Sequence, residues 1–181
     1  MTEILKYRIS DYTQKELEYF SKFIQGNPKV KKNETAVAHY FTLKYIAEKL
    51  NSDIDKIEFK FNDFGKPYVE NAPNFSITHS GDYVFIAFSC KEIGIDAEII
   101  RTVRHGLLKK ITTDDEYEKI DKSNIDLQTL KIWTIKEAYF KLIGSGIKDI
   151  NSVSTEYILS NFNVSTDITE NYILTTIKKG R

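Results

Sequence analysis

The sequence predicts an α+β protein built from two lobes of similar size. Two observations support this: each half of the chain contains segments with helical periodicity, and each half continues into runs that alternate like strands. With 181 residues, 41% of them hydrophobic, the chain is long enough to bury a sizeable core. Because the strands of the first half end near residues 96–102, we expect lobes of residues 1–97 and 98–181 that pack as one unit.

Two amphipathic helices are expected in the first lobe. In residues 13–25 the apolar side chains recur at helical spacing until Gly26 breaks the pattern. A longer helix is expected for residues 33–51, with Asn33 as its cap. Just before this helix, where the backbone N–H groups and the positive end of the helix dipole favour an anion, lie Lys29, Lys31 and Lys32.

Strands follow in the same lobe. Residues 56–61 alternate as a short strand, and a turn that contains Gly65 and Lys66 comes next. A meander of three further strands is then expected within residues 74–79, 83–89 and 93–100. The middle run is apolar on both faces, so we expect it to be an interior strand.

The second lobe is expected to begin with helices and to end with strands. Residues 113–120 predict a short helix, and residues 131–146 (KIWTIKEAYFKLIGSG) predict a longer one that stops at its glycines. The tail is rich in β-branched and aromatic residues, which favours strands within residues 151–160, 161–168 and 170–177.

Charge and cysteine content exclude several classes of protein. The 26 basic and 26 acidic residues balance, so no sequence-wide attraction to nucleic acid is expected. The single cysteine, Cys90, excludes an internal disulfide framework and a cysteine-based zinc site. No run approaches the roughly 18 apolar residues that a membrane span needs. We therefore expect a cytoplasmic protein that binds neither membranes nor nucleic acid.

Two carboxylates share one face of the strand expected at residues 93–100. Because side chains alternate along a strand, Asp96 and Glu98 point the same way, about 6–7 Å apart. At an effective dielectric constant of about 20 their repulsion is roughly 2–3 kcal/mol, which solvent, a proton or a cation must offset. The pair therefore indicates either a solvent-facing strand edge or a site for Mg²⁺, which prefers oxygen ligands.

The helix expected at residues 131–146 has two contrasting faces. A stripe of apolar residues is expected to face the core: Ile132, Ile135, Tyr139, Leu142 and Ile143. The opposite face combines Glu137 and Lys141 with the rings of Trp133 and Phe140. An i, i+4 ion pair is common on helices and is worth only about 0.2–0.5 kcal/mol. The flanking aromatic rings nevertheless give little reason for this face to meet plain solvent.

The strand expected at residues 74–79 ends in polar groups. Thr78 and His79 precede Ser80 and Gly81, and such a cluster can donate hydrogen bonds to a phosphate. The simpler interpretation of His79 is a hydrogen-bonded structural residue, and the simpler interpretation of the segment around Lys66 is a plain turn.

The order of these motifs is more specific than any one of them. The succession GKP, F-x-I-T-H-S-G, I-G-I-D-A-E and W-T-I-K-E-A-Y-F-K-L-I-G-S-G, over residues 60–150, resembles the 4′-phosphopantetheinyl transferases. It is most similar to the larger, monomeric type that activates peptide synthetases. The resemblance implies two pseudo-symmetric α/β lobes, each with helices on a small, mostly antiparallel sheet, and an active site in the cleft between them.

The resemblance also implies an activity. A holo-[acyl-carrier-protein] synthase of this kind transfers 4′-phosphopantetheine from coenzyme A to a serine of an apo acyl or peptidyl carrier protein, releasing 3′,5′-ADP. The residues that match the family's magnesium ligands are Asp96, Glu98 and Glu137, and Mn²⁺ is an alternative metal. Glu137 is also the candidate base for the serine. Lys141 is expected to contact the pyrophosphate and to stabilise the leaving group.

Further residues are assigned to coenzyme A by the same resemblance. Thr78 and His79 match positions at the 3′-phosphate, and Lys66 matches a position in the nucleotide site. Lys31 and Lys32 stand near positions where the family commonly has arginines, which grip a phosphate with a more defined geometry than lysine does.

The resemblance leaves two matters open. The carrier protein is not identified, but carriers of this kind are acidic and the segment after residue 100 is basic, which suggests docking near Arg101, Arg104 and Lys109. The alternative function is that of a non-catalytic descendant that binds coenzyme A or a carrier protein without transferring a group.

Overall fold

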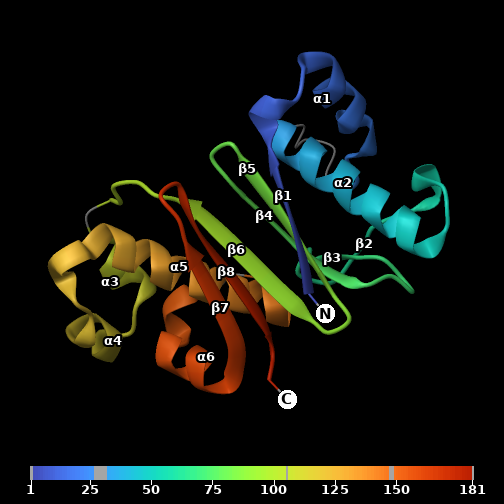
Figure 1. Cartoon of the computed structure of the whole chain (residues 1–181). Helices are drawn as coiled ribbons and strands as arrows, with labels where there is room; N and C mark the ends of the chain where they lie inside the picture. Colours follow the sequence, from blue (N-terminus) through green and yellow to red (C-terminus); the bar gives the residue numbers. More distant parts are fainter. Residues whose placement is uncertain (1, 27–31, 105, 147–148, 181) are drawn as a thin grey trace. The chain divides into compact units, whose positions relative to one another are not determined.

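Figure 1 shows the computed structural model of the chain, which describes residues 2–26, 32–104, 106–146 and 149–180. Helices and small antiparallel sheets are both present, which confirms the predicted α+β class. The chain divides into two compact units, residues 1–91 and 92–181. The predicted boundary between residues 97 and 98 falls within a strand of the second unit, and a division into lobes at that point stays a prediction. Among the helices of the described ranges, none is long and apolar enough to cross a membrane.

The first unit contains a three-stranded antiparallel sheet in the order β1-β5-β4. Its strands are β1 (Thr2–Arg8), β4 (Asn74–Ser80) and β5 (Tyr83–Ser89). A separate hairpin pairs β2 (Lys60–Phe61) with β3 (Pro67–Tyr68). The central position of β5 confirms the expected interior strand, because β1 takes its second edge. No strand was predicted for the residues of β1.

In the part of this unit that the structure describes there are two α-helices. Thr13 and Glu16 form a reciprocal capping box at the start of α1 (Gln14–Phe20), and a 3₁₀ turn, η2 (Ser21–Phe23), completes the predicted segment. The second helix, α2 (Asn33–Leu50), has nearly the predicted bounds and ends at a left-handed residue. The prediction that Asn33 caps α2 is wrong, since Asn33 is its first helical residue and the N-cap position is occupied by Lys32. Aromatic stacking joins the helices, with the rings of Phe20 and Tyr40 4.3 Å apart.

The second unit has its own three-stranded antiparallel sheet, in the order β6-β8-β7. Its strands are β6 (Ile93–Ile99), β7 (Phe162–Ile168) and β8 (Tyr172–Lys179). The expected meander of three strands is therefore wrong in one respect: β4 and β5 form a hairpin, but β6 pairs with β8 of the other sheet. The edge of β5 to which a third meander strand would add is already paired with β1.

Within its described residues, the second unit also has four α-helices: α3 (Leu107–Ile111), α4 (Asp114–Lys119), α5 (Ile125–Ile143) and α6 (Thr155–Asn161). The prediction of a strand within residues 151–160 is wrong, because a 3₁₀ turn, η5 (Ile150–Ser152), and α6 occupy this segment. The Ser154 side chain accepts a hydrogen bond from the backbone N–H of Tyr157 and so caps α6. This local cap outweighs the β propensity of the segment.

The long helix α5 packs against β6 at an unusually close approach. A Cβ atom on Gly94 would lie 1.9 Å from the carbonyl oxygen of Ala138 and 2.5 Å from the backbone nitrogen of Leu142. Only glycine allows this contact between backbones. On the same helix, Ile135, Ala138 and Leu142 pack into an apolar cluster with Ile177 of β8. Ile143, which was expected in the core stripe, is exposed.

We expect Gly94→Ala to lower the free energy of unfolding by about 3 kcal/mol, because the new methyl group would force helix and strand apart. Chemical denaturation followed by circular dichroism measures this change. A matched control is Gly106→Ala, where φ is 79° but no atom lies within 4 Å of the added Cβ. The control should cost only about 1 kcal/mol of backbone strain. Equal losses in both variants would contradict the close approach.

Candidate active site

The face of β6 that carries the two carboxylates is turned toward α5. Gly94 meets the backbone of α5, and Asp96 and Glu98 share its face because side chains alternate along a strand. Thr175, the partner of Asp96 on β8, faces the same way, and its hydroxyl lies 2.9 Å from that of Thr134 on α5. Asp96 is therefore buried, with 5% of its surface exposed, and the alternative of a solvent-facing strand edge is wrong for this residue.

Helix α5 brings Glu137 and Lys141 to this face. Glu137 is 8% exposed. The ammonium of Lys141 donates a hydrogen bond to Oδ1 of Asp96 at 2.7 Å, so the lysine is bonded to the strand and not to the glutamate one turn away. The structure thus brings Asp96 of the strand together with Glu137 and Lys141 of the helix, two elements that are well separated in the sequence.

Glu137 has an unusual acidity. Burial, as the largest cause, and the negative charge of Asp96 together raise the pKa of its carboxyl group from 4.5 to about 7. Lys141 opposes this effect, while Glu98 adds to it. The electrostatic environment of Glu137 therefore disfavours a second anion beside Asp96 and would favour a cation.

Glu98 is the more exposed of the two carboxylates on β6. Its side chain accepts a hydrogen bond from Nη2 of Arg101 at 3.3 Å, and both side chains are partly exposed. A pair with this exposure contributes little to stability. Glu98 can therefore change partner at small cost, whereas Asp96 is fixed by its surroundings.

Asp96, Glu98 and Glu137 are the residues that would hold the implied magnesium ion. Carboxylate oxygens are the ligands that Mg²⁺ prefers, and the chemistry of Asp96, Glu98 and Glu137 fits that ion. Within the described part of the chain, however, no three such side chains lie close enough together to form a metal site. Lys141 instead supplies the positive charge at Asp96.

Apart from Lys141, the residues assigned to coenzyme A belong to the first unit. Thr78 and His79 are consecutive on β4 and so face opposite ways, with Thr78 buried and His79 exposed. Lys66 lies in the β2–β3 turn, where its backbone N–H donates to Oδ1 of Asn62 at 2.9 Å. Lys32 is exposed, and its ammonium lies 3.9 Å from the carboxylate of Glu34. Lys31 lies outside the described residues.

Trp133 has a structural place on α5. Its ring packs beside the apolar cluster of Leu108, Ile111 and Ile132, which joins α3 to α5. A second lysine of this helix, Lys136, is buried, which the sequence did not predict. Its position in the middle of a largely apolar helix is compatible with burial, but it does not identify the groups to which the ammonium bonds.

The raised pKa of Glu137 makes stability depend on pH. In metal-free protein between about pH 5 and pH 7, the unfolded chain has released the Glu137 proton while the folded chain still holds it, so stability falls as pH rises. Above pH 7 the free energy of unfolding stops falling, after a total loss of about 2–3 kcal/mol. Glu137→Gln should remove this part of the pH dependence.

The measurement is the free energy of unfolding across this pH range in the presence of a chelator. Glu118→Gln provides the matched control, because Glu118 is an exposed glutamate on α4 of the same unit. A Glu137→Gln variant with the same pH profile as the wild type would contradict the assignment.

Comparisons with known proteins agree with the motif resemblance. The sequence profile of the 4′-phosphopantetheinyl transferase superfamily matches residues 92–180, which include both β6 and α5. The 4′-phosphopantetheinyl transferase gsp of Aneurinibacillus migulanus is 34% identical over 108 residues, 58% of this chain and 45% of that protein. The 4′-phosphopantetheinyl transferase Sfp of Bacillus subtilis (strain 168) is 28% identical over 149 residues, 75% of this chain and 66% of that protein.

A eukaryotic relative is similar in the same way. The L-aminoadipate-semialdehyde dehydrogenase-phosphopantetheinyl transferase of Xenopus laevis is 29% identical over 125 residues, 58% of this chain and 41% of that protein. The chain spans about half the length of the curated relatives it matches. Of the motifs that carry the resemblance, the two that contain Asp96, Glu98 and Glu137 lie within the matched profile, whereas GKP and F-x-I-T-H-S-G precede it. The matched region, residues 92–180, thus belongs to the 4′-phosphopantetheinyl transferase superfamily.

Proposed function

We propose that this protein transfers 4′-phosphopantetheine from coenzyme A to a serine of an apo carrier protein and releases 3′,5′-ADP. The observation that carries the proposal is the junction of β6 and α5, where Lys141 bonds to the buried Asp96 and Glu137 lies in the field of both. This group lies within the region matched by the superfamily profile. We further propose that the protein acts as a monomer in the cytoplasm.

Asp96, Glu98 and Glu137 are the proposed ligands of Mg²⁺ or Mn²⁺. When bound, the ion supplies positive charge that polarises the pyrophosphate of coenzyme A. Lys141 would leave Asp96 and turn to the pyrophosphate, a movement consistent with its partly exposed side chain. The three carboxylates would then hold the metal ion, while the ammonium of Lys141 would contact the pyrophosphate.

The proposed reaction forms one P–O bond and breaks another. The serine oxygen forms a bond to the β-phosphorus of coenzyme A, and the bond from that phosphorus to the oxygen of 3′,5′-ADP breaks. Glu137 is the candidate acceptor of the serine proton, because a carboxylate at the proposed site of the pyrophosphate can act as a general base. Lys141 stabilises the charge on the leaving group.

The proposal gives coenzyme A contacts from the first unit as well. Lys66, Thr78 and His79 are the proposed ligands of its nucleotide and 3′-phosphate, with Lys31 and Lys32 contributing positive charge. The hydroxyl and ammonium groups of these residues suit an anion.

The direct test is transfer to a panel of apo acyl and peptidyl carrier proteins with coenzyme A and Mg²⁺. We expect at least one carrier to gain the mass of a phosphopantetheine group and expect a chelator to prevent the gain. Asp96→Asn and Glu137→Gln should each reduce transfer to about 1% or less, because each removes a negative charge from the metal site. Glu118→Gln is the control for loss of an exposed carboxylate. Unmodified carriers across the whole panel would refute the proposed activity.

A second prediction concerns docking of the carrier. Arg104 and Lys109 are exposed, and Lys109 lies on α3 above the ring of Tyr117. Reversal of both charges should raise the KM for an acidic carrier about tenfold, because an attractive surface becomes repulsive. The KM for coenzyme A should stay unchanged.

Arg101 is left unaltered in this test because it bonds to Glu98, a proposed metal ligand. Lys131→Glu is the control, since Lys131 is exposed on α5 of the same unit. An unchanged carrier KM in the double reversal would exclude docking at this surface.

A further inference from the structure

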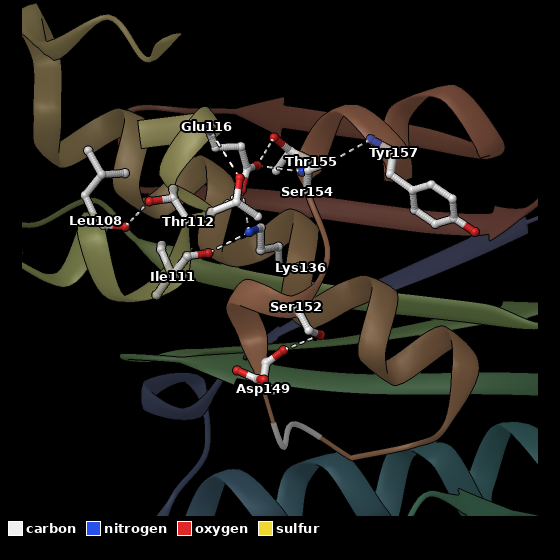
Figure 2. A network of polar contacts seen from close by, with 11 residues as sticks. Leu108, Ile111, Thr112, Glu116, Lys136, Asp149, Ser152, Ser154, Thr155 and Tyr157 are labelled. Atoms are coloured by element: carbon white, nitrogen blue, oxygen red, sulfur yellow. Dashed lines mark hydrogen bonds and ion pairs between the residues drawn. The ribbon is translucent and has the colours of Figure 1, made fainter. Parts of the chain in front are cut away.

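Behind the candidate site, α5 carries a second lysine that is entirely buried. The side chain of Lys136 is 0% exposed, and its ammonium donates to Oε2 of Glu116 at 2.7 Å and to the carbonyl oxygen of Ile111 at 2.6 Å. Figure 2 shows this ammonium between the end of α3 and the carboxylate on α4. Lys136 therefore fixes α5 to two other helices through its single charged atom.

Glu116 is the centre of a larger network. Its Oε1 accepts hydrogen bonds from the backbone N–H and the hydroxyl of Thr155, both at 2.6 Å, and thereby holds the first residue of α6. Its Oε2 accepts from the backbone N–H of Thr113 at 3.0 Å, in the capping box of α4. The carboxylate thus accepts four hydrogen bonds, its full capacity. These bonds outweigh the effect of burial and hold the pKa of Glu116 below its ordinary value.

Such a pair is poorly explained by stability alone. Burying two charges carries a large desolvation penalty, and replacing a buried ion pair by well-packed apolar residues is often neutral or stabilising. Apolar side chains already hold α5 against the sheet through the cluster around Ala138 and Leu142. The ion pair adds a defined orientation of α5, because hydrogen bonds of 2.6–2.7 Å tolerate little displacement of the ammonium.

The orientation of α5 determines where Glu137, the residue after Lys136, projects. Lys136 and Glu137 are consecutive on α5, so their side chains leave the helix about 100° apart. A rotation of α5 about its axis would move both side chains together. Gly94 fixes how closely α5 approaches β6, whereas the bonds of Lys136 fix the rotation at which Glu137 projects toward Asp96.

We propose that Lys136 and Glu116 are positioning residues, whose buried ion pair holds α5 at the rotation that presents Glu137 to the carboxylates of β6. The inference rests on the proposed function, since it assigns the pair to the transfer reaction. Neither residue is assigned a contact with substrate.

The test compares Lys136→Met and Glu116→Gln with Ile132→Ala. Methionine keeps most of the volume of lysine without its charge, and glutamine keeps the shape of Glu116 while losing the ion pair. Ile132 is buried on the same helix in an apolar cluster, so its truncation destabilises α5 while leaving every polar group of the network in place. The three proteins are compared at a temperature at which circular dichroism shows each to be folded.

Two quantities are measured: the kcat and KM of transfer, and the affinity for Mn²⁺ by calorimetry without any carrier. For Lys136→Met and Glu116→Gln we expect kcat to fall about 10- to 100-fold, the KM for coenzyme A to change less than threefold and Mn²⁺ to bind about tenfold more weakly. Ile132→Ala should keep both kcat and Mn²⁺ affinity within about twofold. Lys136→Arg, which retains the charge, should recover part of the lost kcat.

The outcomes separate the two proposals. A wild-type protein that transfers nothing to any carrier contradicts the proposed function itself. A wild type that is active, with either network variant folded and within about twofold of its kcat and Mn²⁺ affinity, overturns the positioning role. Losses of similar size in Ile132→Ala would also overturn it, because they would show that destabilisation of α5 is sufficient.

Discussion

The second unit depends on the contact between the backbones of Gly94 and Ala138. Because no side chain separates helix from strand at this point, α5 lies close enough for Lys141 to reach Asp96 across the junction. A residue with a Cβ atom at position 94 would push the helix outward and lengthen that hydrogen bond. The spacing of the motif follows from this constraint: the glycine sets the approach, and the carboxylates two and four residues later share its face.

The same close approach brings the carboxyl groups of Asp96 and Glu137 near each other, and their repulsion is only partly offset. Asp96 and Glu137 are both buried, and the burial that excludes water also strengthens the repulsion between their charges. Lys141 offsets the charge of Asp96, but the pKa of Glu137 still rises to about 7. The single positive charge of Lys141 does not compensate all the carboxylates, which is a physical reason for a divalent cation to bind there. In this respect the acidic group differs from carboxylates on an ordinary solvated surface.

Sequence periodicity predicted the elements that have a regular apolar pattern, and it failed where distant partners decide the structure. It placed α2, β4, β5 and β6 well and put Asp96 and Glu98 on one face. It did not reveal that β6 joins a different sheet from β5, because alternation says which face is buried and not which strand lies alongside. It also missed α6, where Ser154 and the distant Glu116 provide the cap. The partner of Lys136 lies 20 residues away, beyond any helical repeat.

The two lysines of α5 show how one helix can hold both a fixed and an exchangeable cation. Lys136 is wholly buried and bonded to a carboxylate whose capacity is filled, so its release would leave charge stranded in the interior. Lys141 also bonds to a buried carboxylate, but its own side chain is 29% exposed and can reach solvent by rotation. Removing Lys141 from Asp96 therefore requires only another cation in its place, whereas removing Lys136 requires the surrounding helices to move. The first lysine suits a scaffold and the second suits a site that takes up a metal and an anionic ligand together.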